Sequence, residues 1–252
     1  MEIRGSRILI TGGARGLGRT FALELASAGA QVGVCDQDGD GLAALAGDMP
    51  GRGLSVWTHH ADVSDEASVI QLFADFVTQH GGIDAVVNNA GLNRDGLLIK
   101  KSGETLVRLP LAEWQAVIDV DLTGVFLCAR EAAYHMMAQG SGGVIVSISS
   151  LARKGNVGQT NYSAAKAGVV AMTAVWAMEL ARYGIRAAAI APGLTATEMT
   201  ESMPEDIRRR MTESIPLRRM GQPGEVSHAL RFVLENEYIS GRVIDIDGGF
   251  GL

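Results

Sequence analysis

Cysteine is scarce in this sequence, and the two cysteines that it has form no recognisable site. Cys35 and Cys128 lie far apart among 252 residues, so neither a CxxC motif nor a disulfide framework is present. This usage favours a reducing compartment, and we expect a cytoplasmic protein. The five histidines also lack the spacing of metal ligands, so no metal site is expected.

An excess of positive charge and a long apolar run are missing as well. Lys and Arg number 22 against 28 Asp and Glu, which gives a net charge of −6. A mildly acidic chain has no basic surface for nucleic acid or for an anionic membrane. The most apolar stretch, Ala167–Met178, is much shorter than a membrane span. We therefore expect neither nucleic acid nor a membrane among the partners.

Glycine, in contrast, is abundant, with 32 residues, and the chain alternates between two kinds of segment. Short apolar runs without strict alternation predict strands that are covered on both faces, and segments with helical periodicity lie between them. The strands are predicted at Arg7–Thr11, Gln31–Asp36, Leu54–His60, Ile83–Asn88, Gly143–Ser149, Ile185–Ala191 and Arg242–Asp247, and the helices at Leu17–Ala28, Ala67–Gln79, Leu111–Gln139, Tyr162–Tyr183 and Gly224–Glu235. This alternation indicates a single α/β domain with a doubly wound parallel sheet, in which ligands bind beyond the carboxyl ends of the strands.

A glycine-rich turn follows the first predicted strand and opens the first helix. Its sequence is Thr-Gly-Gly-Ala-Arg-Gly-Leu-Gly, residues 11–18. Glycines let the backbone approach a pyrophosphate, and the start of a helix presents free N–H groups and a partial positive charge. We therefore predict that a dinucleotide cofactor binds at Gly12, Arg15, Gly16, Leu17 and Gly18; the alternative is a glycine-rich turn without a ligand.

Asp36 ends the second predicted strand, where the ribose of an adenosine would lie. Its carboxylate can accept hydrogen bonds from the ribose hydroxyls and would repel a 2′-phosphate, so it favours NAD over NADP. Arg15 has the opposite tendency, because a cation in the glycine turn could bind a 2′-phosphate. We give Asp36 the greater weight and predict NAD(H) as the cofactor, with NADP as the less favoured alternative.

More candidate cofactor contacts follow the next two strands. Asp62 and Val63 come after the third strand, and Asn89, Ala90 and Gly91 come after the fourth. Asp62 could accept a hydrogen bond from an adenine amino group, while Ala90 and Gly91 leave room for a flat ring or a ribose. The alternative for both segments is ordinary turn chemistry at strand ends.

Ser149, Tyr162 and Lys166 form the candidate catalytic set. Tyr162 lies thirteen residues after Ser149, and Lys166 is four residues further on. Residues four apart share one face of a helix, so the lysine is expected beside the tyrosine ring. An ammonium about 4 Å away stabilises a phenolate by about 4 kcal/mol at an effective dielectric of about 20, although burial opposes this effect. Tyr162 could then act as a general acid or base on a carbonyl or an alcohol, with Ser149 hydrogen-bonded to the same oxygen.

Taken together, these motifs resemble the short-chain dehydrogenase/reductase family. The resemblance rests on TGGARGLG, Asp36, NNAG, Ser149, YSAAK and Pro192-Gly193. It extends over essentially the whole chain, and GNVGQTNY and PGLTATEM are similar to the 3-oxoacyl reductase subgroup. It implies a Rossmann-type doubly wound sheet of about seven parallel strands with helices on both faces, a nicotinamide cofactor and a homotetramer.

The same resemblance assigns roles to individual residues. Tyr162 would be the general acid/base, Ser149 would position and polarise the substrate oxygen, and Lys166 would support the phenolate and hold the nicotinamide ribose. The remaining cofactor contacts that it implies are Pro192, Gly193, Thr195 and Thr197, of which Thr197 would bond the carboxamide.

One catalytic position departs from the family pattern. Where the family usually has Asn, the segment 120–124 of this chain has Asp121. The asparagine helps to anchor a water that connects to the lysine, chiefly through its main chain, and Asp121 could keep that role. An unpaired carboxylate there would disfavour the phenolate. The sequence therefore predicts an active enzyme with an alkaline optimum.

Substrate contacts are expected in two segments. Asn156, Val157 and Gln159 precede Tyr162 and are expected to face the substrate, and Met199 lies in the segment at about 194–217 that forms a substrate lid in the family.

Residues 92–109 are longer than this connection usually is in the family. Residues 97–109 predict a hairpin around Ser102-Gly103, with basic residues nearby. The hairpin could form a basic rim for an anionic substrate such as an acyl thioester, or it could be a solvated surface feature.

The sequence therefore predicts an NAD(H)-dependent oxidoreductase that transfers a hydride between the cofactor and a small carbonyl or secondary alcohol. One alternative is a reductase of 3-oxoacyl thioesters of a carrier protein or coenzyme A. An alternative from another class is a catalytically weak, nucleotide-binding regulatory protein on the same fold, for which only Asp121 gives support.

Overall fold

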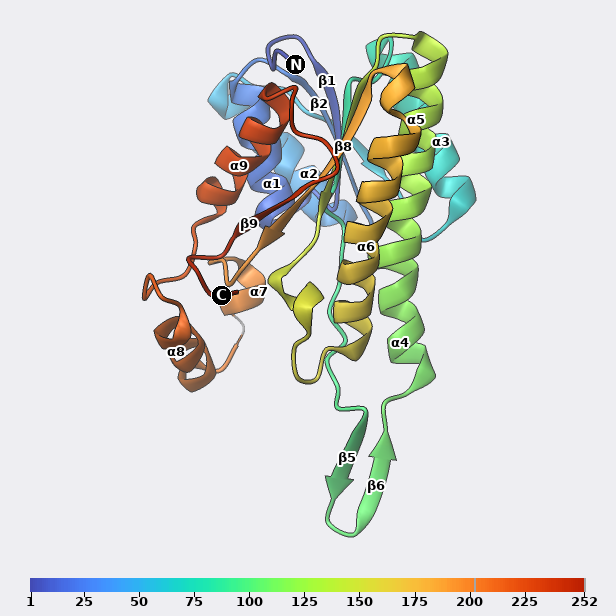
Figure 1. Cartoon of the computed structure of the whole chain (residues 1–252). Coiled ribbons are helices and arrows are strands. Elements are labelled where there is room, and N and C mark those ends of the chain that lie inside the picture. Colours follow the sequence, from blue (N-terminus) through green and yellow to red (C-terminus); the bar gives the residue numbers. More distant parts are fainter. Residues whose placement is uncertain (202, 252) are drawn as a thin grey trace.

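Seven parallel strands form the central sheet, in the order β3-β2-β1-β4-β7-β8-β9 (Figure 1). A computed structural model describes residues 1–201 and 203–251. The strands are β1 (Arg7–Thr11), β2 (Gln31–Asp36), β3 (Trp57–His60), β4 (Ala85–Asn88), β7 (Gly143–Ile148), β8 (Ile185–Pro192) and β9 (Val243–Ile246). Every predicted strand is present, so the doubly wound α/β fold predicted from the sequence is confirmed.

Helices cover both faces of this sheet (Figure 1). On one face lie α1 (Gly16–Ser27), α2 (Gly39–Asp48) and α9 (Pro223–Glu235). On the other face lie α3 (Glu66–His80), α5 (Val125–Gln139) and α6 (Thr160–Glu179), and α4 (Leu111–Ile118) leads towards α5. Shorter elements are the 3-10 turns η1 (Pro50–Arg52), η3 (Leu151–Lys154) and η4 (Ala181–Tyr183) and the helices α7 (Glu198–Glu201) and α8 (Glu205–Ser214). Within the described ranges, no helix is long and apolar enough to cross a membrane.

The core has one layer on each side of the sheet. In β1, Ile8 and Ile10 join the cluster beneath α1 and α9, while Leu9 joins the cluster beneath α3 and α5. Because both faces are buried, the strand residues are apolar throughout, which is why the strand sequences do not alternate. β1 lies between β2 and β4. The chain therefore reverses its direction across the sheet at β1, and the carboxyl ends of β1 and β4 border the crevice where ligands bind in such sheets.

The chain between β4 and β7 departs from regular structure in two places. The predicted helix Leu111–Gln139 is interrupted by a π-helical segment, η2 (Asp119–Gly124). Before it, β5 (Ile99–Ser102) and β6 (Thr105–Arg108) form an antiparallel hairpin that projects from the body of the molecule (Figure 1). We call residues 97–109 the arm.

Three helical segments differ from what the sequence predicts. The sequence does not predict helix α2, because its three glycines weaken the helical pattern. It does not predict helix α8 either, because that helix is too polar to show an apolar stripe. The apolar composition of Ala167–Ala181 predicts burial on all sides, yet in the single chain α6 leaves Val175 43% and Met178 74% exposed.

Candidate active site

The glycine-rich turn between β1 and α1 is packed too tightly for larger residues. Gly12 has a φ of +64°, and a Cβ atom there would lie 2.6 Å from the Cα of Ala90. A Cβ on Gly18 would lie 2.3 Å from the carbonyl oxygen of Gly12. Asn89 holds the turn, because its Nδ2 donates to the carbonyls of Thr11 and Gly12 at 3.1 and 2.8 Å.

The first turn of α1 is open to a ligand. The N-cap residue, Arg15, makes no side-chain cap, and no acidic residue lies in the first turn. Free N–H groups and the helix dipole favour an anion at this position. Together with the bare backbone of the glycine turn, this geometry fits the pyrophosphate of a dinucleotide.

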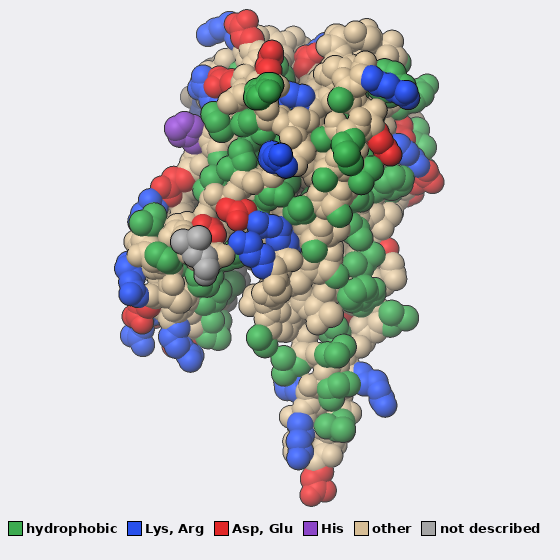
Figure 2. Space-filling model, viewed as in Figure 1, with side chains coloured by type: hydrophobic (Ala, Val, Ile, Leu, Met, Phe, Trp, Pro, Cys, Tyr) green, Lys and Arg blue, Asp and Glu red, His purple; other side chains and the backbone are tan. Residues whose placement is uncertain are grey.

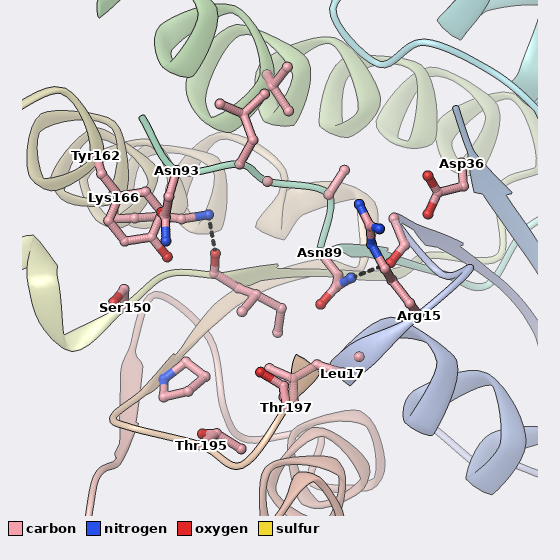
Figure 3. A pocket seen from close by; sticks show the side chains of 18 of the residues that line it. Arg15, Leu17, Asp36, Asn89, Asn93, Ser150, Tyr162, Lys166, Thr195 and Thr197 are labelled. Carbon is pink, nitrogen blue, oxygen red and sulfur yellow. Dashed lines mark hydrogen bonds between the residues drawn. The ribbon is translucent and has the colours of Figure 1, made fainter. Parts of the chain in front are cut away.

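A cavity of about 720 Å³ extends along the carboxyl edge of the sheet, from the glycine turn to α6 (Figure 3). Its size suits a cofactor together with a small substrate. Most of the residues that the sequence predicts for the site line it: Gly12, Arg15, Gly16, Leu17, Asp36, Val63, Asn89, Ala90, Gly91, Ser149, Tyr162, Lys166, Pro192, Gly193, Thr195 and Thr197. Gly18, Asp62 and Asp121 are not among the lining residues.

Asp36 lies at the end of the cavity opposite Tyr162 (Figure 3). Its Oδ2 accepts from the backbone N–H of Ala14 at 3.0 Å, and its Oδ1 accepts from that of Asp38 at 3.1 Å. These bonds fix a carboxylate at the end of β2. The Arg15 side chain is 71% exposed, and its Nη1 lies 3.9 Å from Asp38 Oδ2.

Asp62 makes the contacts of an ordinary turn at a strand end, which is the alternative to an adenine contact. Its Oδ1 accepts from the backbone N–H of Ser64 at 2.8 Å and from the Ser64 hydroxyl at 2.6 Å. The neighbouring residues Ala61 and Val63 line the cavity. A contact between Asp62 and an adenine remains a prediction.

Tyr162 and Lys166 lie on one face of α6 at the inner end of the cavity (Figure 3). Lys166 Nζ is 5.4 Å from the centroid of the Tyr162 ring, and it donates to the carbonyl of Ile148 at 3.1 Å. Only 4% of the Lys166 side chain is exposed. A buried ammonium is therefore held beside the phenol.

Asp121 is the partner that keeps this ammonium charged. It is fully buried in the π-helical segment η2, where its Oδ2 lies 3.1 Å from Lys166 Nζ and its Oδ1 accepts from the N–H of Leu92 at 2.8 Å. Burial opposes the charge on Lys166, but the charges of Asp121 and Tyr162 and the hydrogen bond to Asp121 outweigh it and raise the pKa of Lys166 above its usual value. The carboxylate is paired, in contrast to the unpaired charge considered from the sequence.

Both serines after β7 line the cavity. Ser149 is only 2% exposed, and its Oγ donates to the backbone carbonyl of Lys166 at 2.9 Å, so it lies directly beside α6. Ser150, labelled in Figure 3, accepts from the N–H of Ala152 at 3.1 Å and caps the 3-10 turn η3. Ser149 therefore lies in the cavity, as the sequence predicts, and its bond to the substrate oxygen remains a prediction.

The segment before Tyr162 also differs from its prediction. Val157 is 87% exposed, and Gln159 donates to the Asp95 carboxylate and accepts from Asn156. None of Asn156, Val157 and Gln159 lines the main cavity. The reason is local, because Gly155 and Gly158 have φ values of +105° and +82° and turn the loop outward. The side chain of Met199 lies outside the described part of the structure.

Two further residues support the site without a recognisable sequence signal. Asn161 is fully buried, and its Nδ2 donates to the carbonyls of Arg94 and Glu113 at 2.9 and 3.0 Å. Thr200 donates to the carbonyl of Thr195 at 2.8 Å and accepts from the N–H of Thr197 at 2.9 Å. Asn161 ties the start of α6 to the β4–α4 connection, and Thr200 shapes the loop after β8.

A family model described as Enoyl-(Acyl carrier protein) reductase matches residues 12–251. The chain belongs to the short-chain dehydrogenase/reductase family. It is therefore an oxidoreductase, as the sequence predicts.

Similar proteins cover nearly the whole chain. The 3-oxoacyl-(acyl-carrier-protein) reductase FabG of Thermotoga maritima is 39% identical over 251 residues, with 99% of both chains covered. The 3-oxoacyl-(acyl-carrier-protein) reductase of Synechocystis is 40% identical, with 96% of this chain and 95% of the other covered. Among solved structures, a short-chain type dehydrogenase/reductase from Mycobacterium marinum has a TM-score of 0.89, 35% identity and coverage of 99% and 96%. A provisionally named gluconate dehydrogenase from Agrobacterium tumefaciens has a TM-score of 0.91, 32% identity and coverage of 99% and 97%.

Replacing the two serines separately tests their roles. Ser149→Ala should lower kcat for carbonyl reduction by about 100-fold, because it removes a hydrogen-bond donor to the reacting oxygen. Ser150→Ala should keep kcat within about threefold, since it removes the cap of η3 only. Steady-state kinetics of both variants measure this. The reverse order of losses would transfer the role from Ser149 to Ser150.

Replacing Asp121 tests the ion pair. Asp121→Asn keeps an acceptor for the Leu92 N–H and removes the counter-charge of the Lys166 ammonium. Burial then lowers the pKa of Lys166, and the phenolate loses the positive charge beside it. The rise of kcat/KM for alcohol oxidation should therefore move to higher pH by about one unit. Asp119→Asn, two residues earlier in the same segment, is the matched control and should leave the profile unchanged. An inactive wild type that the Asp121→Asn substitution makes active would contradict a productive role for the pair.

Proposed function

We propose that the protein reduces the 3-oxo group of acyl thioesters to a 3-hydroxy group with NADH. The observation that carries this proposal is the buried Lys166 beside Tyr162, at one end of a cavity that has Asp36 at the other. The substrate class is supported by the relatives from Thermotoga maritima and Synechocystis, which bear the name 3-oxoacyl reductase.

In the proposed reaction, the α6 end of the cavity acts on the carbonyl oxygen. Tyr162 donates its phenolic proton to that oxygen, and Ser149 donates a hydrogen bond to it. The ammonium of Lys166 stabilises the phenolate that is left, and Asp121 keeps the ammonium in place. Bound NADH would supply the hydride for the carbonyl carbon. The product is a secondary alcohol, and Tyr162 regains its proton from solvent.

The residues that would hold the cofactor lie along the rest of the cavity. The N–H groups at the start of α1 would bind the pyrophosphate, and Lys166 would also hold the nicotinamide ribose. The lining residues Pro192, Gly193, Thr195 and Thr197 would border the nicotinamide. Asp36 would accept from the adenosine ribose, and its charge would disfavour a 2′-phosphate.

A second candidate is the oxidation of a small hydroxy compound. It is favoured by the likeness to the provisionally named gluconate dehydrogenase of Agrobacterium tumefaciens. The regulatory alternative from the sequence loses its support, because Asp121 is paired with Lys166 and does not break the catalytic set.

We also infer a homotetramer in a reducing, cytoplasmic compartment. Support comes from the exposed apolar side chains of Val175 and Met178 on α6 and from two buried, free cysteines. Light scattering of the purified protein should give four times the mass of one chain. A monomer would contradict the inferred assembly.

Replacing Asp36 tests the cofactor assignment. The wild type should prefer NADH by tenfold or more in kcat/KM, because a hydrogen bond to a charged group contributes about 1.5–3 kcal/mol. Asp36→Ala should remove most of that preference, and Arg15→Ala should not. Initial rates with both cofactors measure this. A wild type that prefers NADPH would mean that Arg15 outweighs Asp36.

The reaction itself is tested by the loss of NADH absorbance with an acetoacetyl thioester, simple ketones, cyclic diketones and, in the oxidative direction, sugar acids. We expect the thioester to give the highest kcat/KM. Tyr162→Phe should lower kcat by at least about 100-fold, because it removes the acid. Highest activity on sugar acids would favour the second candidate. Tight NADH binding without turnover of any compound would instead favour a nucleotide-binding regulatory protein.

A further inference from the structure

The arm, residues 97–109, has no task in the proposed reaction. It projects from the molecule with hydrophobic and basic side chains together on its surface (Figure 2). Its apolar side chains are between 47% and 66% exposed at Leu97, Leu98, Ile99, Leu106 and Val107. A two-stranded hairpin is only marginally stable in water by itself, and exposed apolar surface of this kind marks a binding region.

The base of the arm is fixed to the active site. Asn161, next to Tyr162, donates to the carbonyl of Arg94 at 2.9 Å. The N–H of Gly96 donates to the carbonyl of Gly158 at 2.7 Å, and Gln159 Nε2 lies 3.1 Å from both carboxylate oxygens of Asp95. The start of the arm therefore has a defined place beside the catalytic helix.

A groove of about 470 Å³ lies at the base of the arm. Asn93 and Arg94 line both this groove and the main cavity, so the two lie next to each other. The wall of the groove is apolar at Leu97, Val107, Leu109 and Pro110, and its cations are Arg94, Lys100 and Arg108. A ligand that leaves the main cavity past Arg94 would thus enter a passage with an apolar wall and a basic rim.

Two of these cations have no counter-charge. Glu113 lies 3.4 Å from Arg94, and Asp95 accepts from Gln159, so the carboxylates in the groove already have polar partners. Among the residues that the structure describes, neither Lys100 nor Arg108 takes part in an ion pair. An anionic ligand would complement them.

The strand register separates the lysines of the arm. Lys100 is paired with Val107, and Lys101 is paired with Leu106. Because side chains alternate along a strand, Lys100 and Val107 share one face of the hairpin. Lys101 lies on the other face, as does Arg108, which is paired with Ile99. Of the two lysines, only Lys100 lines the groove. Lys101 is therefore a matched control for the charge of Lys100.

We propose that the groove binds the phosphorylated pantetheine tail of the acyl thioester, with Lys100 at its phosphate, an inference that rests on the proposed function. The thioester carbonyl would lie in the main cavity, and the tail would pass Arg94 along the apolar wall. Lys100 is the sixth residue after Arg94, so the two Cα atoms are at most about 20 Å apart along an extended chain. Coenzyme A and a carrier protein both present this tail.

The test compares three acetoacetyl thioesters: those of coenzyme A, of a phosphopantetheinylated carrier protein, and of N-acetylcysteamine, which has no phosphate. Lys100→Gln should lower kcat/KM for the phosphorylated thioesters about tenfold, through KM with little change in kcat. The N-acetylcysteamine thioester should react equally well with wild type and variants. Lys101→Gln should behave as wild type with all three, and the difference should shrink at high salt.

The outcomes separate this inference from the proposed function. A loss with only one phosphorylated thioester supports the groove and names the source of the tail. Equal losses with the truncated thioester, or no loss with any thioester, overturn the inference while the proposed function stands. If the wild type reduces none of the three, including the truncated one, the proposed function fails and the inference fails with it.

Discussion

The buried ion pair between Lys166 and Asp121 is the interaction on which the catalytic end of the site depends. A lysine that is almost wholly removed from water would give up its proton in an apolar setting. Here a carboxylate at 3.1 Å reverses that tendency. The same lysine donates to the carbonyl of Ile148, so it has one position and one charge. The positive charge therefore has a fixed place 5.4 Å from the centroid of the Tyr162 ring, where the proposed reaction needs it.

This pair joins parts of the chain that are distant in sequence. The π-helical turn η2 places Asp121 against α6, and the N–H of Leu92, four residues after β4, orients the carboxylate. A Cβ on Gly91 would lie 2.8 Å from Asp121 Oδ2, so the approach requires glycine there. The cofactor end shows the same constraint, where Gly12 lies against Ala90. In both places β4 is followed by small residues because another element must come close.

Features that depend on local pattern could be predicted from the sequence. The order of strands and helices follows from buried apolar runs and helical periodicity, and the glycine turn, Tyr162 and Lys166 follow from spacing within one turn or one helix. The cavity indeed extends from Asp36 to Tyr162. The hairpin at Ser102-Gly103 also appears where turn chemistry places it.

Features that depend on exact register could not be predicted. The hydrogen bond from Ser149 to the Lys166 carbonyl, which holds the end of β7 against α6, has no sequence signal. Gly155 and Gly158 turn their loop outward, so Val157 and Gln159 do not reach the main cavity. The π-helical turn at Asp121 has no pattern that separates it from regular helix, so the pairing of its charge could not be foreseen.

The protonation of Lys166 tests the account most directly. The chain has four lysines, so an NMR titration of isotope-labelled lysine side chains can follow each one, with Lys166→Arg to assign the signal. We predict that the pKa of Lys166 lies above the usual value of a lysine side chain, because Asp121 outweighs burial. A pKa of Lys166 below the usual value would mean that burial dominates and that the ion pair does not support Tyr162.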